Sequence, residues 1–276
     1  MSAMVRPHST PGNTRPDAPR AAVLAPPDRP LPEEVPLALV YNGSTLAVML
    51  GTPEDLEDFA TGFSLTEGIV SSPGELDEIE VVRHPNGFEL RMWLPNNHAR
   101  RLAARQRSLI GPVGCGLCGI DSLDQALHPP RPLPADRLHL TPADIVAAME
   151  GLRACQPLHD ETRAVHAAGF YIPGQGIVLA REDVGRHNAL DKLCGALARA
   201  GIAANSGAVV LTSRVSVDMV QKCASLGAPV LIAASAPTTA GAARAEQGGI
   251  TLAARAHGGA FQIFTHPARI VTKGPQ

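Results

Sequence analysis

The sequence is poor in the residues that mark several large protein classes. It has five cysteines in 276 residues, 3% aromatic residues and a formal net charge of −2. An odd and sparse set of cysteines is not a disulfide framework. A charge this close to zero gives no reason to expect binding to nucleic acid or to a membrane surface. No apolar run approaches the ~18 residues that a membrane span needs.

The N-terminal stretch, Met1 to about Leu31, is rich in Pro and Arg and shows no hydrophobic periodicity, which predicts a disordered arm. It lacks the apolar segment of a secretory signal, so we expect a protein of the reducing cytosol, where free thiols are stable. The remaining residues are numerous enough to bury a hydrophobic core that needs no disulfide or metal for stability. We expect a small α+β unit over 32–110, a Gly-rich CxxC loop and linker over 111–134, and an α/β core domain over 135–276.

Turn and cap residues define the elements of the small unit. Asn42-Gly43 stands between two apolar runs, a pattern typical of a type I′ hairpin. Thr52-Pro53 predicts the start of a helix, with Thr52 as its cap, that ends near Glu67 at Gly68. Two further strands are expected around Pro85-Asn86-Gly87. A basic helix over 100–107 should follow.

Helices and continuously apolar strands alternate from Thr141 onward, which predicts a layered α/β domain with helices on both faces of a sheet. Helices are expected over 142–154, 185–199, 215–226 and 238–247. Strands are expected over 165–172, 177–180, 208–212, 229–233, 251–254 and 261–265.

Cys115-x-x-Cys118 lies in a stretch so rich in glycine that we predict a loop. Exposed backbone amides in such a loop lower the pKa of a thiol. The pair could perform dithiol–disulfide exchange, supply half of a zinc site, or carry sulfur as a persulfide with the second thiol assisting. The bland alternative, two small residues in a turn, is disfavoured because structural cysteines are usually buried. Three further cysteines lie on helical patterns and are interpreted as buried small hydrophobes: Cys155, Cys194 and Cys223.

A polar cluster spans Arg181–Lys192, with Arg186, His187 and Asn188 in the first turn of a predicted helix. Free N–H groups at a helix start, together with Arg and His, favour an anion or phosphate site. The alternative is a solvated helix start with pairs such as Asp183 with Arg186.

Two more strand-to-helix junctions have a similar layout. Thr212-Ser213-Arg214 and Ser235-Ala236-Pro237-Thr238-Thr239 each follow a predicted strand. Ligands bind at such strand ends in open α/β sheets, so we expect the three junctions to border one crevice. Taken singly, each could be a helix cap, which is the preferred interpretation for Thr238.

His166-Ala167-Ala168 can be compared with the His-x-Glu of zinc deaminases. Ala168 stands where the acid–base Glu would be, and the cysteine pair precedes the His instead of following it. Deaminase chemistry is therefore not expected.

The motifs together resemble the formate dehydrogenase accessory sulfurtransferases, the FdhD family. The resemblance runs from about residue 33 to 271 and is most specific in Arg181-Glu-Asp-Val-Gly-Arg-His-Asn-Ala-Leu-Asp-Lys192. Two departures are Arg163-Ala164, where the family usually has Gly-Gly, and Ser213, where it usually has Gly. The other matching stretches are Thr52–Gly68, Gly114–Gly119, Ser213–Ser216 with Met219–Lys222, and Ser235–Thr238.

The resemblance implies a cytidine-deaminase-like α/β/α core with a smaller N-terminal α+β unit. It implies a sulfurtransferase that takes sulfur from a cysteine desulfurase and passes it to the molybdenum cofactor, in its bis-guanine-dinucleotide form, before insertion into formate dehydrogenase. The persulfide-bearing residue falls on Cys115, with Cys118 beside it. Cofactor contacts fall on Phe261, Gln262, Ile263, Phe264, Thr265 and His266, in addition to Arg186, His187, Arg214 and Ser235 of the crevice.

Two other functions stay open. One is a chaperone that binds and delivers the molybdenum cofactor without catalysis, with the thiols as metal ligands. The other is a dithiol oxidoreductase. No zinc is expected, because the cysteine pair has no evident second pair of ligands. A homodimer is open as well.

Overall fold

The structure is a computed structural model that describes residues 29–95, 133 and 138–271. The chain divides into Met1–Pro30 and one compact unit, Leu31–Gln276, which holds every element below. The predicted arm (through residue 28), the helix over 100–107 and nearly all of the loop and linker over 111–134, including Cys115 and Cys118, lie outside the described residues. The proposed boundary between a small unit and a core domain therefore stays a prediction.

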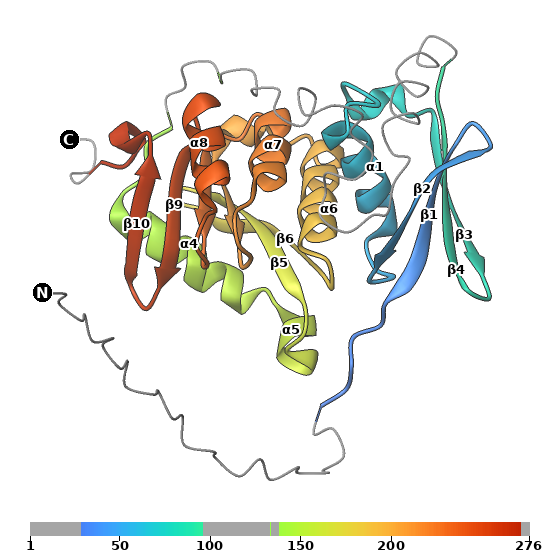
Figure 1. The fold of residues 1–276 in the computed structure, drawn as a ribbon, viewed down its shortest axis with the longest axis horizontal. Coiled ribbons are helices and arrows are strands. Elements are labelled where there is room, and N and C mark those ends of the chain that lie inside the picture. Colours follow the sequence, from blue (N-terminus) through green and yellow to red (C-terminus); the bar gives the residue numbers. More distant parts are fainter. Residues whose placement is uncertain (1–28, 96–132, 134–137, 272–276) are drawn as a thin grey trace, which may run out of the picture. The chain divides into compact units, whose positions relative to one another are not determined.

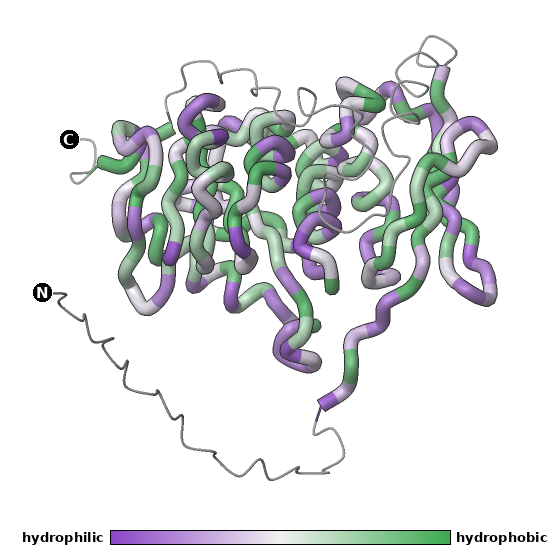
Figure 2. Tube along the Cα trace, in the orientation of Figure 1, coloured by the Kyte–Doolittle hydropathy of each residue, from purple (hydrophilic) through white to green (hydrophobic). Residues whose placement is uncertain are grey.

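A four-stranded sheet comes first, in the order β2-β1-β4-β3. The strands are β1 (Val35–Tyr41), β2 (Ser44–Gly51), β3 (Glu78–His84) and β4 (Gly87–Trp93). Asn42 and Gly43 both have positive φ, 48° and 79°, as the predicted type I′ turn requires. Figure 2 shows hydrophilic residues at the tips of both hairpins and a mixture of hydrophobic and hydrophilic residues along their strands.

Helix α1 (Leu56–Thr66) covers one face of this sheet, and their apolar side chains form a core. The helix begins three residues later than predicted, after Asp55 in a left-handed conformation, so Thr52 is not its cap. Instead, the Thr52 hydroxyl accepts a hydrogen bond from the N–H of Val184, 132 residues away. The predicted cap is wrong because the Thr52 hydroxyl binds a residue that is distant in the sequence and not the start of α1. The largest buried side chains of this core are Leu37, Leu39, Tyr41, Phe59, Ile69, Leu90 and Met92.

A six-stranded mixed sheet has the order β10-β9-β8-β7-β5-β6 (Figure 1). Its centre, β7 (Ala208–Leu211), β8 (Val230–Ala233) and β9 (Thr251–His257), is parallel. Antiparallel strands flank it: β5 (His166–Ile172) and β6 (Gly176–Asp183) on one side, and β10 (Ala260–Thr265) on the other.

Side chains of this sheet alternate between two cores, as residues on successive positions of a strand must. On one face Val209 and Leu231 pack under α6 (Arg186–Arg199), α7 (Val217–Leu226) and α8 (Thr239–Gln247). On the other face Val210 and Ile232 pack under α4 (Pro142–Ala154). The α/β fold with helices on both faces is therefore confirmed. Helix α4 has the predicted bounds, α7 begins two residues late, and α5 (Pro157–Thr162) was not predicted.

Helices α1 and α6 lie side by side and join the two sheets (Figure 1). Gly62 and Gly195 allow the close approach, because a Cβ at either position would stand within 2 Å of the partner backbone. Lys222 of α7 joins the same group of helices through Asp191 of α6, at 2.8 Å, and Glu67 beyond the end of α1, at 3.0 Å.

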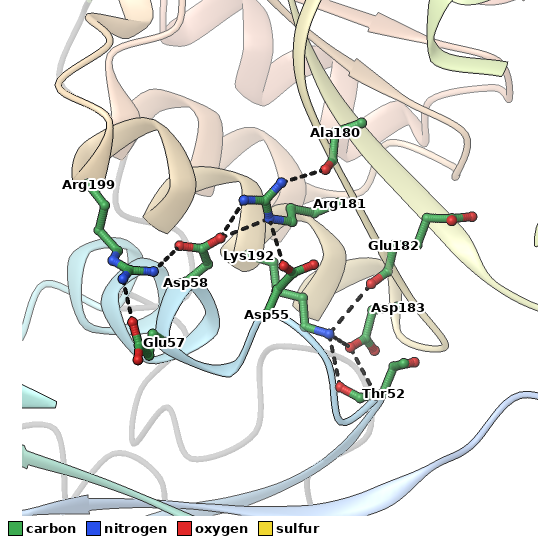
Figure 3. Close-up of polar contacts among 10 residues, drawn as sticks. All are labelled: Thr52, Asp55, Glu57, Asp58, Ala180, Arg181, Glu182, Asp183, Lys192 and Arg199. Atoms are coloured by element: carbon green, nitrogen blue, oxygen red, sulfur yellow. Dashed lines mark hydrogen bonds and ion pairs between the residues drawn. The ribbon is translucent and has the colours of Figure 1, made fainter. Parts of the chain in front are cut away.

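Asp58 adds an ionic link between α1 and the larger sheet (Figure 3). One carboxylate oxygen accepts from Arg181 of β6 at 2.6 Å, and the other accepts from Arg199 of α6 at 2.6 Å. Asp58 is 5% exposed, so this shared carboxylate is a buried link and not a surface contact. No helix among the described residues is long and apolar enough to cross a membrane.

Candidate functional site

The three strand-to-helix junctions lie along one edge of the six-stranded sheet. β6 and β7 both run antiparallel to β5, which lies between them, so β6, β7 and β8 all end at this edge. His166, the first residue of β5, is paired with Asp183, the last residue of β6, and so lies at the same edge. The three junctions therefore share one side of the sheet, as expected, whereas the crevice that they are expected to border stays a prediction. We call this side the ligand edge.

Arg186 and His187 form the first turn of α6 at the ligand edge. Gly185, the N-cap residue, has no side chain to cap the helix, and Ser216 makes no side-chain cap bond at the start of α7. In contrast, Thr238 caps α8 through Gly241, as predicted. The first N–H groups of a helix have no partner within the helix and favour an anion. Within the described residues, the buried Nε of Arg186 has no hydrogen-bond partner.

His187 contacts Asp218, an acid in the first turn of α7. The His187 side chain is 18% exposed and that of Asp218 is 7% exposed. Burial raises the pKa of Asp218, but the hydrogen bond and charge of His187 outweigh burial and hold that pKa below its usual value. The contact ties the starts of α6 and α7 together. Asp218 was not predicted from the sequence. The signal that could have indicated it is its position four residues after Arg214, in the first turn of a predicted helix.

His166 is half-buried beside these groups. Burial lowers its pKa, and the charges of Arg186 and His187 lower it further. A neutral imidazole at neutral pH is the consequence. The ligand edge therefore combines the positive charge of Arg186 with the neutral imidazole of His166, which can form hydrogen bonds.

Arg214 is exposed just before α7, while Ser213 is buried and its hydroxyl donates to the Arg214 carbonyl. Val215 pairs with Pro237 in an isolated parallel bridge, so the β7–α7 and β8–α8 junctions are directly joined. Ser235, half-buried, belongs to the second of these junctions. An exposed guanidinium beside two helix starts suits a phosphate group.

The polar cluster 181–192 splits into two sets of side chains. Arg181 and Asp183 belong to β6 and not to the predicted loop, because that strand continues through Asp183. Arg181 binds Asp58, and Asp183 binds Lys192 in a pair that is 0% exposed on both sides (Figure 3). The Asp183–Arg186 pair is not formed. Among the described residues, Arg186 and His187 are the members of this cluster that lie at the ligand edge, with His187 also bonded to Asp218.

The segment 261–266 lies on β10, two strands away from β8 at the far end of the sheet. Gln262, Ile263 and Phe264 are exposed, whereas Phe261 packs toward the α4 core. Thr265 is buried, with its hydroxyl bonded to Ile250 and Leu252, and His266 follows it near the carbonyl of Glu246.

Arg255 connects part of this segment to the ligand edge and was not found from the sequence. It is exposed and has φ of 54°, and its N–H donates to the carbonyl of Ser235. Its guanidinium donates to Gln262 at 3.2 Å and lies 5.9 Å from the Phe264 ring centre. Gln262 and Phe264 are thus linked to Ser235 through Arg255, whereas Thr265 and His266 face the opposite edge. A bulge residue of this kind leaves no pattern in the sequence.

The cysteines divide differently from the prediction. Cys194 and Cys223 are fully buried, and burial raises the pKa of both thiols, that of Cys223 to about 12. Cys155 is exposed, because it caps the C-terminus of α4, where the chain leaves the helix; its predicted burial was wrong. The described residues contain no group of three or more His, Cys, Asp or Glu side chains that could hold a metal ion.

Comparison with known proteins decides the family. The model of the FdhD/NarQ family matches residues 32–271. The chain belongs to the FdhD/NarQ family. A sulfur carrier protein FdhD from Agrobacterium fabrum is 53% identical over 244 residues, 88% of this chain and 90% of the relative. The sulfur carrier protein FdhD of Cupriavidus necator is 47% identical over 251 residues, 91% of this chain and 86% of the relative.

A solved structure shares the fold of this FdhD/NarQ chain. A crystal structure of a protein assigned as a formate dehydrogenase accessory protein from Desulfotalea psychrophila aligns with TM-score 0.67 and 27% identity. It covers 87% of this chain and 90% of that one. The structure explains why Gly is favourable at position 163, where this chain has Arg. Arg163 ends α5 with φ of 57°, a conformation that Gly adopts without strain.

Proposed function

We propose that this chain is a sulfur carrier for the maturation of formate dehydrogenase. Its similarity over 88% of its length to a protein named as a sulfur carrier, at 53% identity, is the observation that carries the proposal. The pair Cys115 and Cys118 supplies the chemistry, because two thiols at this spacing can hold and release a sulfur atom. We place the protein in the cytosol, where its thiols stay reduced.

Sulfur enters by thiolate exchange. The Cys115 thiolate attacks the outer sulfur of a persulfide on a cysteine desulfurase; an S–S bond forms on Cys115, and the bond to the donor cysteine breaks. The donor thiolate leaves, so the sulfur is transferred without net oxidation of the two proteins. Cys115 is then a persulfide.

Sulfur leaves as sulfide if Cys118 acts as the resolving thiol. Cys118 attacks the inner sulfur of the Cys115 persulfide, forming a Cys115–Cys118 disulfide and releasing hydrosulfide. The two thiols supply the two electrons that reduce the transferred sulfur. A cellular thiol reductant then restores the pair. The acceptor in this proposal is the bis-guanine-dinucleotide molybdenum cofactor, taken as substrate before its insertion into formate dehydrogenase.

The ligand edge suits the guanine dinucleotide part of this substrate. Arg214 is exposed, Arg186 carries a buried Nε without a partner among the described residues, and both lie at helix starts without side-chain caps. Phosphate groups favour such positions. The exposed Phe264 ring beside Arg255 gives a face for a base. We propose no role for zinc in this transfer.

A maturation assay tests the proposal. Cells that lack their own sulfur carrier should recover formate dehydrogenase activity with the wild-type chain and not with Cys115→Ala. Cys155→Ala is the matched control, because Cys155 is an exposed cysteine outside the pair. Normal activity with Cys115→Ala would refute the persulfide role.

A further inference from the structure

The carboxylate of Asp183 has every acceptor position occupied. Oδ1 accepts from the N–H of Gly185 at 2.7 Å and from Asn188 at 3.0 Å. Oδ2 accepts from the N–H of Thr52 at 3.0 Å and pairs with Lys192 at 2.7 Å. A carboxylate offers about four such positions, so none is left for a ligand.

The partners of Asp183 are bonded to one another as well. Lys192 also donates to the carbonyls of Thr52, at 2.9 Å, and Glu182, at 3.5 Å (Figure 3). Together with the Asp183 carboxylate, these two carbonyls occupy the three N–H donors of the Lys192 ammonium group. Asn188 donates its second N–H to the carbonyl of Leu50. The end of β2 and the start of α6 are therefore bonded through a network whose side chains, Asp183, Asn188 and Lys192, are buried.

This network holds the turn that leads into α6. The N–H of Val184 donates to the Thr52 hydroxyl, and the N–H of Gly185 donates to Asp183. The next two residues are Arg186 and His187, the part of the polar cluster that faces the ligand edge. The orientation of Arg186 and His187 therefore depends on this turn, whose two N–H groups are both hydrogen-bonded to side chains of the protein.

Stability alone does not account for such a pair. A buried ion pair loses about as much in desolvation as it gains in attraction, and apolar residues of similar size are often equally stable. A set of converging bonds does, however, restrict the turn to one conformation. We propose that Asp183, paired with Lys192, is a positioning residue that aims Arg186 and His187 at the ligand, an inference that rests on the proposed nucleotide-binding role of the ligand edge.

Binding of GDP, measured by calorimetry, gives the test. Asp183→Asn keeps the shape but replaces an acceptor by a donor, and should weaken GDP binding about tenfold, a typical coupling between neighbouring groups. In a chain that already carries Arg186→Ala and His187→Ala, the same change should weaken GDP binding less than about twofold, because the residues that it positions are gone.

The matched control is Asp58→Asn, which changes another buried, ion-paired carboxylate, one that links α1 to β6 and to the last residue of α6 and does not bond to the turn. It should lower the stability to urea with little change in GDP affinity. If Asp183→Asn does not fold, Thr52→Val removes only the acceptor of the Val184 N–H and should show the same dependence on Arg186 and His187.

The outcomes separate the two proposals. Equal losses of affinity in both backgrounds, or an equal loss from Asp58→Asn, would overturn the positioning role while leaving the ligand edge in place. No binding of GDP by the wild-type chain would overturn the ligand edge itself, and the positioning role with it.

Discussion

A Cβ on Gly62 of α1 would stand 1.7 Å from the carbonyl oxygen of Asp191 on α6. A Cβ added on Gly195 of α6 would likewise stand 1.9 Å from the carbonyl oxygen of Asp58 on α1, so the two helices meet backbone to backbone. The Arg and His residues proposed to bind ligand begin α6. The contact between α1 and α6 therefore supports the ligand edge from the side of the smaller sheet.

Gly62→Ala should destabilise the protein, because the added methyl group meets backbone that cannot rotate away. We expect a loss of about 3 kcal/mol in the free energy of unfolding, at the upper end for overpacking. Urea unfolding followed by circular dichroism measures it. Gly74→Ala is the control, since its added Cβ would meet nothing within 4 Å. Equal stability of the two variants would show that the helices can separate without cost.

The Asp218 carboxylate should make the protein sensitive to acid. Its folded-state pKa is lowered by His187, so its contribution to stability is present above the unfolded-state pKa and is lost as the pH falls through the folded-state value. His187→Ala removes the largest effect that opposes burial, so the pKa of Asp218 should rise above its value in the wild type.

We therefore expect His187→Ala to begin unfolding at a higher pH than the wild type and to lose about 1–3 kcal/mol at neutral pH, the cost of an unpartnered buried group. Carboxyl NMR titration of Asp218, with urea midpoints from pH 7 downward, measures both. The control is His84→Ala, whose partner Glu89 lies on the surface. An unchanged Asp218 titration in His187→Ala would contradict the assigned cause.

Arg214→Ala should weaken the binding of GDP by about 1.5–3 kcal/mol, the usual contribution of a hydrogen bond to a charged group. Arg214 is exposed, so the fold should not change. Calorimetry on both proteins measures it, with Arg83→Ala on the exposed side of β3 as the control. Equal affinity in the Arg214 variant would remove that residue from the ligand site.

The sequence predicted the elements better than their contacts. The Asn42-Gly43 turn, α4 and the helices on both faces follow from local patterns, and the structure has them. The pairing of Lys192 with Asp183, 9 positions apart but joined also by Thr52, depends on tertiary structure.

The candidate site shows the same limit. A helix start rich in Arg and His could be recognised from the sequence, and it lies at the predicted edge. Two contacts could not be recognised: Asp218 against His187, and Arg255 in a left-handed bulge beside Ser235. Both join segments that are distant in the sequence, and no local periodicity encodes such a meeting.

Mass spectrometry of the intact protein shows whether Cys115 carries sulfur as a persulfide. The wild-type chain is incubated with a cysteine desulfurase and cysteine, and then with or without a reductant, beside Cys115→Ala and Cys118→Ala. We expect a gain of one sulfur atom on the wild type and on Cys118→Ala, lost on reduction, and no gain on Cys115→Ala. An unmodified wild-type chain, or an equal gain on Cys115→Ala, would contradict it.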